Sequence, residues 1–153
     1  MPVPPLTTGQ IPVTRKLRID PGRVRVFVCD DDLDFATEMA AALTASGFEA
    51  RTLKDGKTPV EIFELFAPDV VLLDLHMPPP DGFEIVNHIV QNTAARHVSV
   101  AILSGADDKT LEIANSFCKG RGLKPAAVLQ KPVRLSDVLT VCFSHHRPDR
   151  VMA

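Results

Sequence analysis

The 153-residue chain has no tryptophan, no tyrosine and 3 cysteines. The cysteines, Cys29, Cys118 and Cys142, are odd in number, widely spaced and set among apolar neighbours. Such spacing fits a disulfide or zinc framework poorly, because both need closely grouped ligands or partners. The sequence therefore predicts reduced, buried thiols whose role is packing.

The chain also lacks a strong excess of either charge, with a formal net charge of -2 and a pI near 6.2. A strongly basic chain would be expected for a partner such as nucleic acid or an anionic membrane. No apolar stretch approaches the roughly 20 residues that cross a bilayer, and the Pro-rich start lacks the apolar core of a signal peptide. We therefore expect a cytoplasmic protein with neither a membrane segment nor a nucleic-acid partner.

The composition, with 45% hydrophobic and 24% charged residues, is that of one globular domain. Residues 1–22 are rich in proline, carry few large apolar side chains and show no period, so we expect a flexible tail there. The predicted domain covers residues 23–147, and residues 148–153 form a short C-terminal tail.

Apolar runs with many β-branched residues alternate with segments of helical periodicity along the predicted domain. The expected strands are 23–30, 48–53, 70–73, 97–103 and 126–130, and the expected helices are 33–46, 58–68, 83–90, 107–119 and 134–145. Strict alternation predicts an α/β fold with a parallel sheet and helices on both faces. Five strands fit the doubly wound order 2-1-3-4-5, in which ligands bind outside the carboxyl ends of the strands.

Acidic residues follow two strands that are neighbours in this order. Asp30 and Asp31 end the first strand, and Asp74 ends the third, in "VVLLDLHMPPPDG". Carboxylates gathered at one crevice repel each other unless a cation compensates their charge. A hard divalent ion with oxygen ligands, and Mg²⁺ above all, is the expected solution.

The fourth and fifth strands end in residues that complement these acids. Ser104-Gly105 supplies a hydroxyl group beside a residue without a side chain, and Lys131 supplies an ammonium group that can hold an anion. A metal ion, a hydroxyl and an ammonium around a carboxylate are what in-line phosphoryl transfer requires. Asp74 is therefore the expected nucleophile.

In order along residues 24–146, "VFVCDDD", "VVLLDLHMPPPDG", "AILSG" and "VLQKP" each stand at a strand end. This ordered set resembles the receiver domain of two-component response regulators, which has the flavodoxin-like fold. The resemblance implies that Asp74 accepts a phosphoryl group from a histidine kinase or a histidine phosphotransfer protein. It also implies a signalling domain rather than an enzyme, with at most slow self-dephosphorylation.

The resemblance further assigns roles to single residues. Asp31 and Asp74, with the main-chain carbonyl of His76, would ligate Mg²⁺, and Asp30 would assist directly or through water. Ser104 would hydrogen-bond a phosphoryl oxygen. Lys131 would pair with another phosphoryl oxygen, from a cis peptide bond to Pro132.

Two features depart from the family pattern. Val128 stands where receivers usually have Tyr or Phe, a ring that moves when the domain switches. The stretch between Ser104 and Lys131 is also longer than usual, and its sequence is similar to receivers beside cyclic-di-GMP phosphodiesterase domains or in small stand-alone regulators.

The face made by the fourth helix, fifth strand and fifth helix is where similar domains form homodimers or bind a downstream protein. The residues that belong either to it or to the core are Ile113, Phe117, Val138, Val141 and Cys142.

Other interpretations compete with this one. Asp30, Asp31 and Asp32 could serve only to cap the following helix, which is the role that we expect for Asp32 itself. A phosphorylation-independent docking module is favoured by Val128. An aspartyl-nucleophile phosphohydrolase of the haloacid dehalogenase type would need Asp-x-Asp-x-Thr/Val, which Asp34 fails to complete. His145 and His146 receive no role, because adjacent helical residues point in different directions.

Overall fold

The computed structural model describes residues 23–56, 58–77, 82–92, 98–105, 108–123 and 125–145. The predicted N-terminal tail, 1–22, and the predicted C-terminal tail, 148–153, lie outside these ranges. The described ranges contain every residue to which the sequence assigned a chemical role.

The elements alternate as predicted. They are β1 (Arg25–Cys29), α2 (Leu33–Ala45), β2 (Glu49–Thr52), the 3-10 helix η1 (Leu53–Asp55), α3 (Pro59–Phe66), β3 (Val70–Asp74), α4 (Gly82–Gln91), β4 (Ser99–Ser104), α5 (Asp108–Gly120), β5 (Ala127–Gln130) and α6 (Leu135–Ser144). The strands form one five-stranded sheet in the order β2-β1-β3-β4-β5, and all its pairs are parallel. The predicted fold is confirmed.

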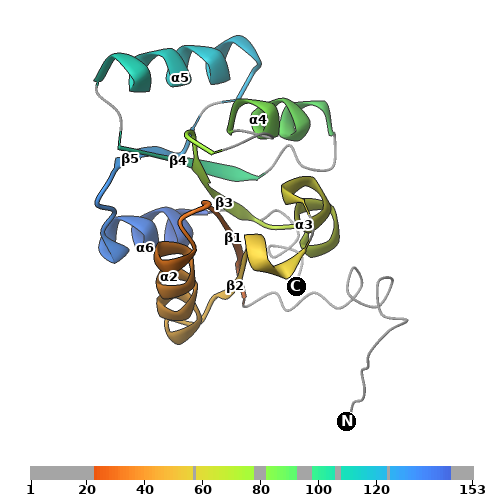
Figure 1. Cartoon of the computed structure of the whole chain (residues 1–153), viewed down its shortest axis with the longest axis vertical. Coiled ribbons are helices and arrows are strands. Elements are labelled where there is room, and N and C mark those ends of the chain that lie inside the picture. Colours follow the sequence, from red (N-terminus) through yellow and green to blue (C-terminus); the bar gives the residue numbers. More distant parts are fainter. Residues whose placement is uncertain are drawn as a thin grey trace.

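Helices cover both faces of the sheet, with α2 and α6 on one side and α3, α4 and α5 on the other (Figure 1). Successive residues of a strand point to opposite faces, so each central strand contributes to two separate cores. On β3, Val71 and Leu73 pack with α3 and α4, while Val70 and Leu72 pack with α2 and α6. This two-sided burial explains why β1 and β3 are apolar without interruption.

Local signals in the sequence fix several helix ends. The Asp32 side chain accepts a hydrogen bond from the main-chain N–H of Phe35 and caps α2, as predicted. Beyond the end of α2, Gly47 has a φ of +99°, a conformation that glycine adopts at low cost. Thr58 caps α3 and Pro59 occupies its first turn.

The second strand ends earlier than predicted, at Thr52 rather than at Leu53. The Thr52 side chain accepts a hydrogen bond from the Lys54 N–H, and the Asp55 carboxylate accepts one from the Thr52 N–H. This reciprocal capping closes a short 3-10 turn and draws Leu53 out of the strand.

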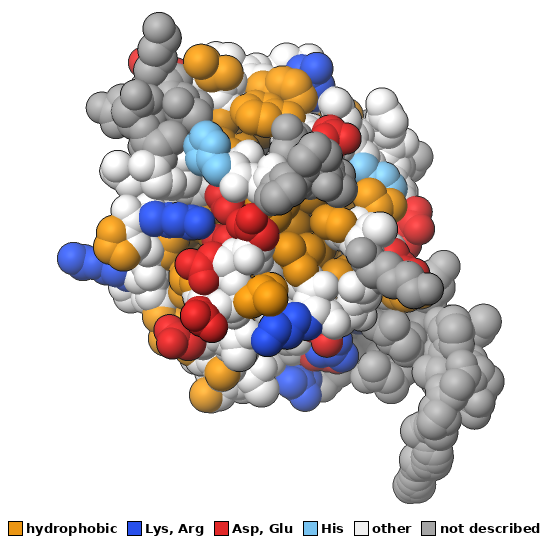
Figure 2. Space-filling view, viewed as in Figure 1, with side chains coloured by type: hydrophobic (Ala, Val, Ile, Leu, Met, Phe, Trp, Pro, Cys, Tyr) orange, Lys and Arg blue, Asp and Glu red, His pale blue; other side chains and the backbone are white. Residues whose placement is uncertain are grey.

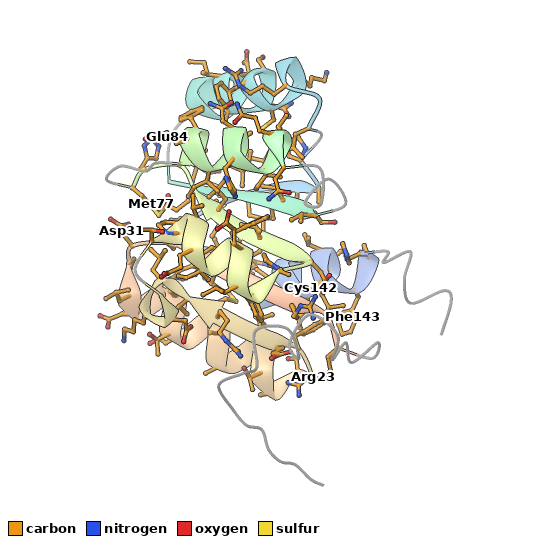
Figure 3. The ribbon with its side chains drawn as sticks, turned by 90° about the vertical axis from the view of Figure 1, so that its right-hand side faces the viewer. Arg23, Asp31, Met77, Glu84, Cys142 and Phe143 are labelled. Atoms are coloured by element: carbon orange, nitrogen blue, oxygen red, sulfur yellow. The ribbon has the colours of Figure 1, made fainter. Side chains whose placement is uncertain are left out.

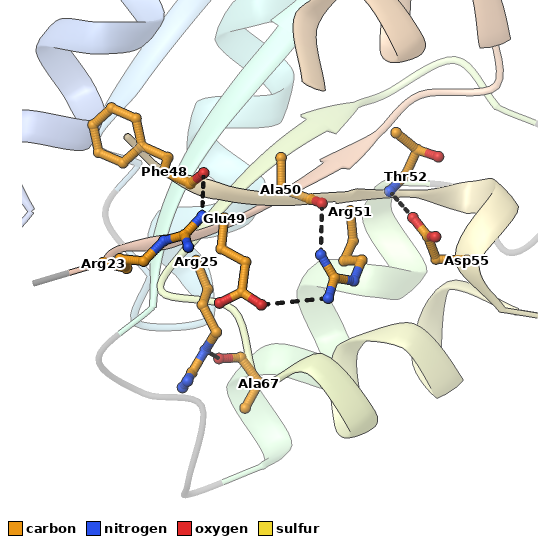
Figure 4. Close-up of polar contacts among 9 residues, drawn as sticks. All are labelled: Arg23, Arg25, Phe48, Glu49, Ala50, Arg51, Thr52, Asp55 and Ala67. Carbon is orange, nitrogen blue, oxygen red and sulfur yellow. Dashed lines mark hydrogen bonds and ion pairs between the residues drawn. The ribbon is translucent and has the colours of Figure 1, made fainter. Parts of the chain in front are cut away.

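Arginine side chains bind main-chain carbonyls around the edge strand β2 (Figure 4). Arg23 donates to Phe48 O at 3.2 Å, Arg25 to Ala67 O at 3.0 Å and Arg51 to Ala50 O at 2.9 Å. Charged side chains at a sheet edge discourage pairing with another chain. Arg23 and Arg51 therefore contribute to the structure of the edge at β2, whereas Arg25, on β1, ties that strand to Ala67 at the end of α3.

The structure separates buried from exposed positions among the five residues that the sequence assigned either to the core or to the interaction face. Val138, Val141 and Cys142 of α6 are buried, Phe117 is partly buried, and Ile113 of α5 is 55% exposed.

Among the described helices, none is both long and apolar enough to cross a membrane.

The three thiols are expected to be unreactive in the folded protein. Cys29, Cys118 and Cys142 are free and buried. Burial raises the pKa of Cys29 and of Cys142 to about 12 and also raises that of Cys118, so the reactive thiolate is scarce near neutral pH. A disulfide-exchange reagent should titrate all three thiols in denaturant and react only slowly without it. Rapid reaction of a native thiol would contradict this packing.

Candidate functional site

The predicted site residues meet at the carboxyl edge of the sheet. Asp30 follows β1, Asp74 and Ser104 are the last residues of β3 and β4, and Lys131 follows β5. Figure 3 shows Asp31 on one side of the molecule and Arg23, which precedes β1, on the other. Parallel strands bring their ends together in this way, so residues distant in the sequence form one cluster.

Three carboxylates form an acidic group at this edge. Asp30, Asp31 and Asp74 each offer an oxygen atom, and these atoms lie within 4.8 Å of one another. Asp30 is 0% exposed and Asp74 is 3% exposed, whereas Asp31 is open to solvent. Acidic side chains gather on this face of the molecule beside hydrophobic ones (Figure 2). Oxygen donors of this kind suit a hard divalent cation.

Lys131 joins the two buried acids. Its Nζ lies 2.9 Å from Asp30 Oδ2 and 3.5 Å from Asp74 Oδ2. The ion pair is the compensation for Asp30 Oδ2, a buried atom to which no described residue donates a hydrogen bond of regular geometry. Burial by itself lowers the pKa of Lys131, but the contact and charge of Asp30 and the charge of Asp74 outweigh it. The pKa of Lys131 is therefore raised.

The surroundings of Asp74 act on its charge in opposite directions. Burial raises the pKa of the Asp74 carboxyl, and the nearby charge of Asp30 raises it further. A hydrogen bond from the His76 N–H to Asp74 Oδ1, at 3.1 Å, and the charge of Lys131 lower it. The pKa of Asp74 is raised overall, which means that its charged form is disfavoured in the folded protein. An additional cation beside this carboxylate would stabilise the charged form.

Ser104 is fully buried beside the acidic group. It lies one residue beyond Leu103, the β4 partner of Asp74 in the sheet register. The Ser104 carbonyl accepts a hydrogen bond from the Lys131 N–H at 2.9 Å, which ties the end of β4 to the residue after β5. The peptide bond between Lys131 and Pro132 is cis, as the resemblance implied.

Two residues near the cluster serve its framework or its rim. The Asp32 N–H donates to Asp30 Oδ1 at 2.9 Å, so the capping residue of α2 also holds the buried acid. The His76 side chain is exposed, and its main-chain N–H is the part that contacts Asp74. The role of the His76 carbonyl as a metal ligand remains a prediction.

The structure also shows contacts that the sequence did not reveal. The Phe35 ring lies near Lys131, with 5.8 Å between Nζ and the ring centroid. His145, which received no role, is buried at the end of α6, and its Nδ1 lies 2.7 Å from Ser99 Oγ. Helical periodicity could have placed Phe35 on the inner side of α2, but no local pattern links either residue to its distant partner.

Gly82 packs directly against the strand end that carries Asp74. A Cβ atom at this position would lie 2.9 Å from the Asp74 carbonyl oxygen and 3.0 Å from Leu75 Cα. Gly82→Ala is therefore expected to lower the free energy of unfolding by about 1–3 kcal/mol and to displace the acceptor strand end. Denaturant unfolding measures the first effect, and phosphoryl acceptance measures the second.

Gly120→Ala is the matched control, because a Cβ atom there meets nothing within 4 Å. Alanine inside a helix is favoured over glycine, so this variant should be as stable as the parent or slightly more so. Equal stability of the two alanine variants would contradict the close approach at Gly82.

Comparison with known proteins agrees with this geometry. The family model for the response regulator receiver domain matches residues 26–141. The response regulator PleD of Caulobacter vibrioides is 32% identical over 85 residues, which are 56% of this chain but only 19% of PleD. The chain therefore spans about a fifth of that relative. The chemotaxis protein CheY of Halobacterium salinarum is 30% identical over 114 residues, covering 72% of this chain and 92% of CheY.

A solved structure of the chemotaxis protein CheY4 from Vibrio cholerae superimposes with a TM-score of 0.69 at 20% identity. The match covers 81% of this chain and 99% of that one. At this identity the likeness concerns the fold, which has the same five-stranded parallel sheet and surrounding helices. Together with the matched family model, it shows that the chain belongs to the response regulator receiver domain family.

Proposed function

We propose that this domain accepts a phosphoryl group on Asp74 from a histidine kinase or a histidine phosphotransfer protein and thereby changes its affinity for a downstream protein. The observation that carries the proposal is a buried carboxylate whose Oδ2 lies 3.5 Å from the ammonium of Lys131, at a sheet edge with two further acids. A buried carboxylate and an ammonium group beside it are typical of a nucleophile that receives an anionic group.

The transfer forms a bond between an Asp74 carboxylate oxygen and phosphorus while the bond from phosphorus to the donor's histidine nitrogen breaks. The nitrogen keeps the electron pair of that bond, and Asp74 becomes an acyl phosphate. Lys131, already beside Asp74, would pair with a phosphoryl oxygen, and the Ser104 hydroxyl would donate to another. The same groups serve transfer from a small donor such as acetyl phosphate.

The acidic group fits Mg²⁺ as its partner. Asp30, Asp31 and Asp74 provide hard oxygen donors from the ends of two adjacent strands, and the single ammonium of Lys131 offsets only part of the charge of these three carboxylates. Mg²⁺ bound there would supply positive charge that offsets the charge developing on the phosphoryl oxygens. The carboxylates hold it, and the main-chain carbonyl of His76 is the further ligand that we propose.

The switched surface that we propose is formed by α5, β5 and α6. Val128 on β5 is 38% exposed and Ile113 on α5 is 55% exposed, so apolar side chains face solvent on this side. Phosphorylation adds charge beside Ser104, the last residue of β4 and the neighbour of β5. A shift at Ser104 would therefore reach this surface through the β4–β5 pairing, with a downstream protein or a second copy of the chain as its partner.

The test treats the purified chain with acetyl phosphate and Mg²⁺ and follows acyl phosphate formation by intact mass. Wild type should gain one phosphoryl group, and both chelation of Mg²⁺ and Asp74→Asn should abolish the gain. Asp32→Asn is the matched control, because asparagine caps a helix as well as aspartate does, so this variant should react like wild type.

Phosphorylation that persists in Asp74→Asn would refute Asp74 as the acceptor. Absence of modification in wild type, combined with partner binding that Asp74→Asn leaves intact, would favour the phosphorylation-independent docking module. Sustained turnover of phosphate monoesters dependent on Asp30 would instead indicate a phosphohydrolase.

A further inference from the structure

The Phe35 ring stands beside the ammonium group of Lys131. The distance from Lys131 Nζ to the ring centroid is 5.8 Å, within the range of a cation–π contact. Phe35 lies in the first turn of α2, is partly buried and packs against the core between that helix and the sheet. Packing against this core therefore restricts the position of the ring.

Main-chain and side-chain contacts link Phe35 to the same buried acid that Lys131 binds. Asp30 Oδ1 accepts from the Asp32 N–H at 2.9 Å, and Asp32 Oδ1 accepts from the Phe35 N–H at 3.2 Å. Lys131 contacts the same acid through its 2.9 Å ion pair with Asp30 Oδ2. Each member fixes the next, so the ring position is coupled to the position of the buried acid.

Lys131 needs such support because its side chain is 31% exposed and is carried by a flexible four-carbon stem. Water competes for its ammonium group, and the incoming phosphoryl oxygen must find that group near Asp74. An aromatic face attracts the ammonium without adding negative charge to a site that already holds three carboxylates. It also leaves the N–H groups available to oxygen acceptors.

We propose that Phe35 is a positioning residue that holds the ammonium of Lys131 over the acidic group in readiness for the phosphoryl group. This inference deepens the proposed function and rests on it. It predicts that the rate of phosphoryl acceptance depends on the aromatic ring of Phe35 and not merely on apolar bulk at this position.

The experiment compares two substitutions of Phe35 with a control. Phe35→Leu keeps apolar bulk and removes the ring, while Phe35→Trp restores an aromatic face of greater cation affinity. Phe143→Leu is the matched control, because Phe143 is 70% exposed, contacts the Phe48 ring and lies on the opposite side of the molecule from Asp31 (Figure 3). All three variants are first checked for cooperative unfolding.

The initial rate of acyl phosphate formation with acetyl phosphate and Mg²⁺ is the first readout. Phe35→Leu should slow it about two- to fivefold, which is the range that a partly exposed cation–π contact permits. Phe35→Trp should recover wild-type behaviour, and Phe143→Leu should leave the rate unchanged. An unchanged rate in Phe35→Leu, or equal losses in the Leu and Trp variants, would overturn the proposal.

A second readout does not depend on phosphorylation. Ring currents from Phe35 should shift the NMR resonances of the Lys131 ε-methylene protons, and Phe35→Leu should move them toward the values of a solvated lysine. Identical Lys131 resonances with and without the ring would overturn the proposal even if phosphorylation proceeds. If wild type accepts no phosphoryl group while the ring-current shift is present, the proposed function fails and the ring contact stands. Should Phe35→Leu not fold, nuclear Overhauser contacts between Phe35 and Lys131 in wild type test the proposal instead. Their presence would support it, and their absence would overturn it.

Discussion

Lys131→Met is expected to lower the free energy of unfolding by about 2–3 kcal/mol and to reduce the rate of phosphoryl acceptance at least about 100-fold. The stability loss follows because Asp30 is fully buried and its Oδ2 has Lys131 as its compensation. Removing the ammonium leaves a desolvated carboxylate beside the charge of Asp74. Methionine keeps most of the apolar stem, so the loss reports the charge rather than the packing.

Urea unfolding in the absence of divalent ions measures this effect, and an unchanged dependence on denaturant would show that the native state keeps its compactness. The double variant Asp30→Asn with Lys131→Met should recover most of the lost stability, since it removes both members of the pair. If Lys131→Met unfolds at the same urea concentration as wild type, the ion pair with Asp30 does not stabilise the fold.

Asp74→Asn is expected to have opposite effects on function and stability. It should abolish acyl phosphate formation, because the amide has no carboxylate oxygen to attack phosphorus. It should also raise the free energy of unfolding by about 1–2 kcal/mol without divalent ions, because one of two adjacent desolvated carboxylates disappears. Gains of this kind at functional residues are a common consequence of sites that sacrifice stability for activity.

The stability gain should depend on pH in a defined direction. Folding raises the pKa of Asp74, so the carboxyl is protonated in both states below its ordinary pKa and carries no penalty there. The Asp74 contribution lowers the stability of wild type as the pH rises from that value through the raised folded-state pKa, and this contribution is absent from Asp74→Asn. The gap between the two proteins should therefore be small in acid, widen across this window and narrow when Mg²⁺ is added.

Asp69→Asn is the matched control, because Asp69 is a buried acid just before β3, at the end of the strand opposite Asp74. Its carboxylate accepts a hydrogen bond from the Arg25 N–H at 2.8 Å, so it is compensated by the fold. Asp69→Asn should not stabilise the protein. A similar gain in both variants would mean that the effect is general to buried acids and unrelated to the cluster.

The fold was predictable because its signals are local and repeated. The uninterrupted apolar character of 70–73 predicts a strand buried on two faces, and alternation with helices then restricts the topology. Asp32 and Gly47 could be assigned to the ends of α2 from residue type alone. The end of β2 was misplaced by one residue because the Thr52–Asp55 capping competes with strand pairing, and periodicity contains no measure of that competition.

The composition of the site was predictable, but its energetics were not. Asp30, Asp74 and Lys131 were expected to meet because parallel strands align their carboxyl ends. The sequence gives no reason for Asp30 to be fully buried while Asp31, its neighbour, is exposed; that difference arises from the path of the chain between β1 and α2. The contact of Phe35 with Lys131 also joins residues nearly 100 positions apart, which local patterns do not report.

The most direct test of the account is chemical identification of the phosphorylated residue. The chain is phosphorylated with acetyl phosphate and Mg²⁺, the acyl phosphate is reduced with borohydride, and the peptides are sequenced by mass spectrometry. Homoserine should replace aspartate at position 74 and at no other acid of the cluster. Reduction at Asp30 or Asp31, or a phosphoryl group found on His76, would contradict it.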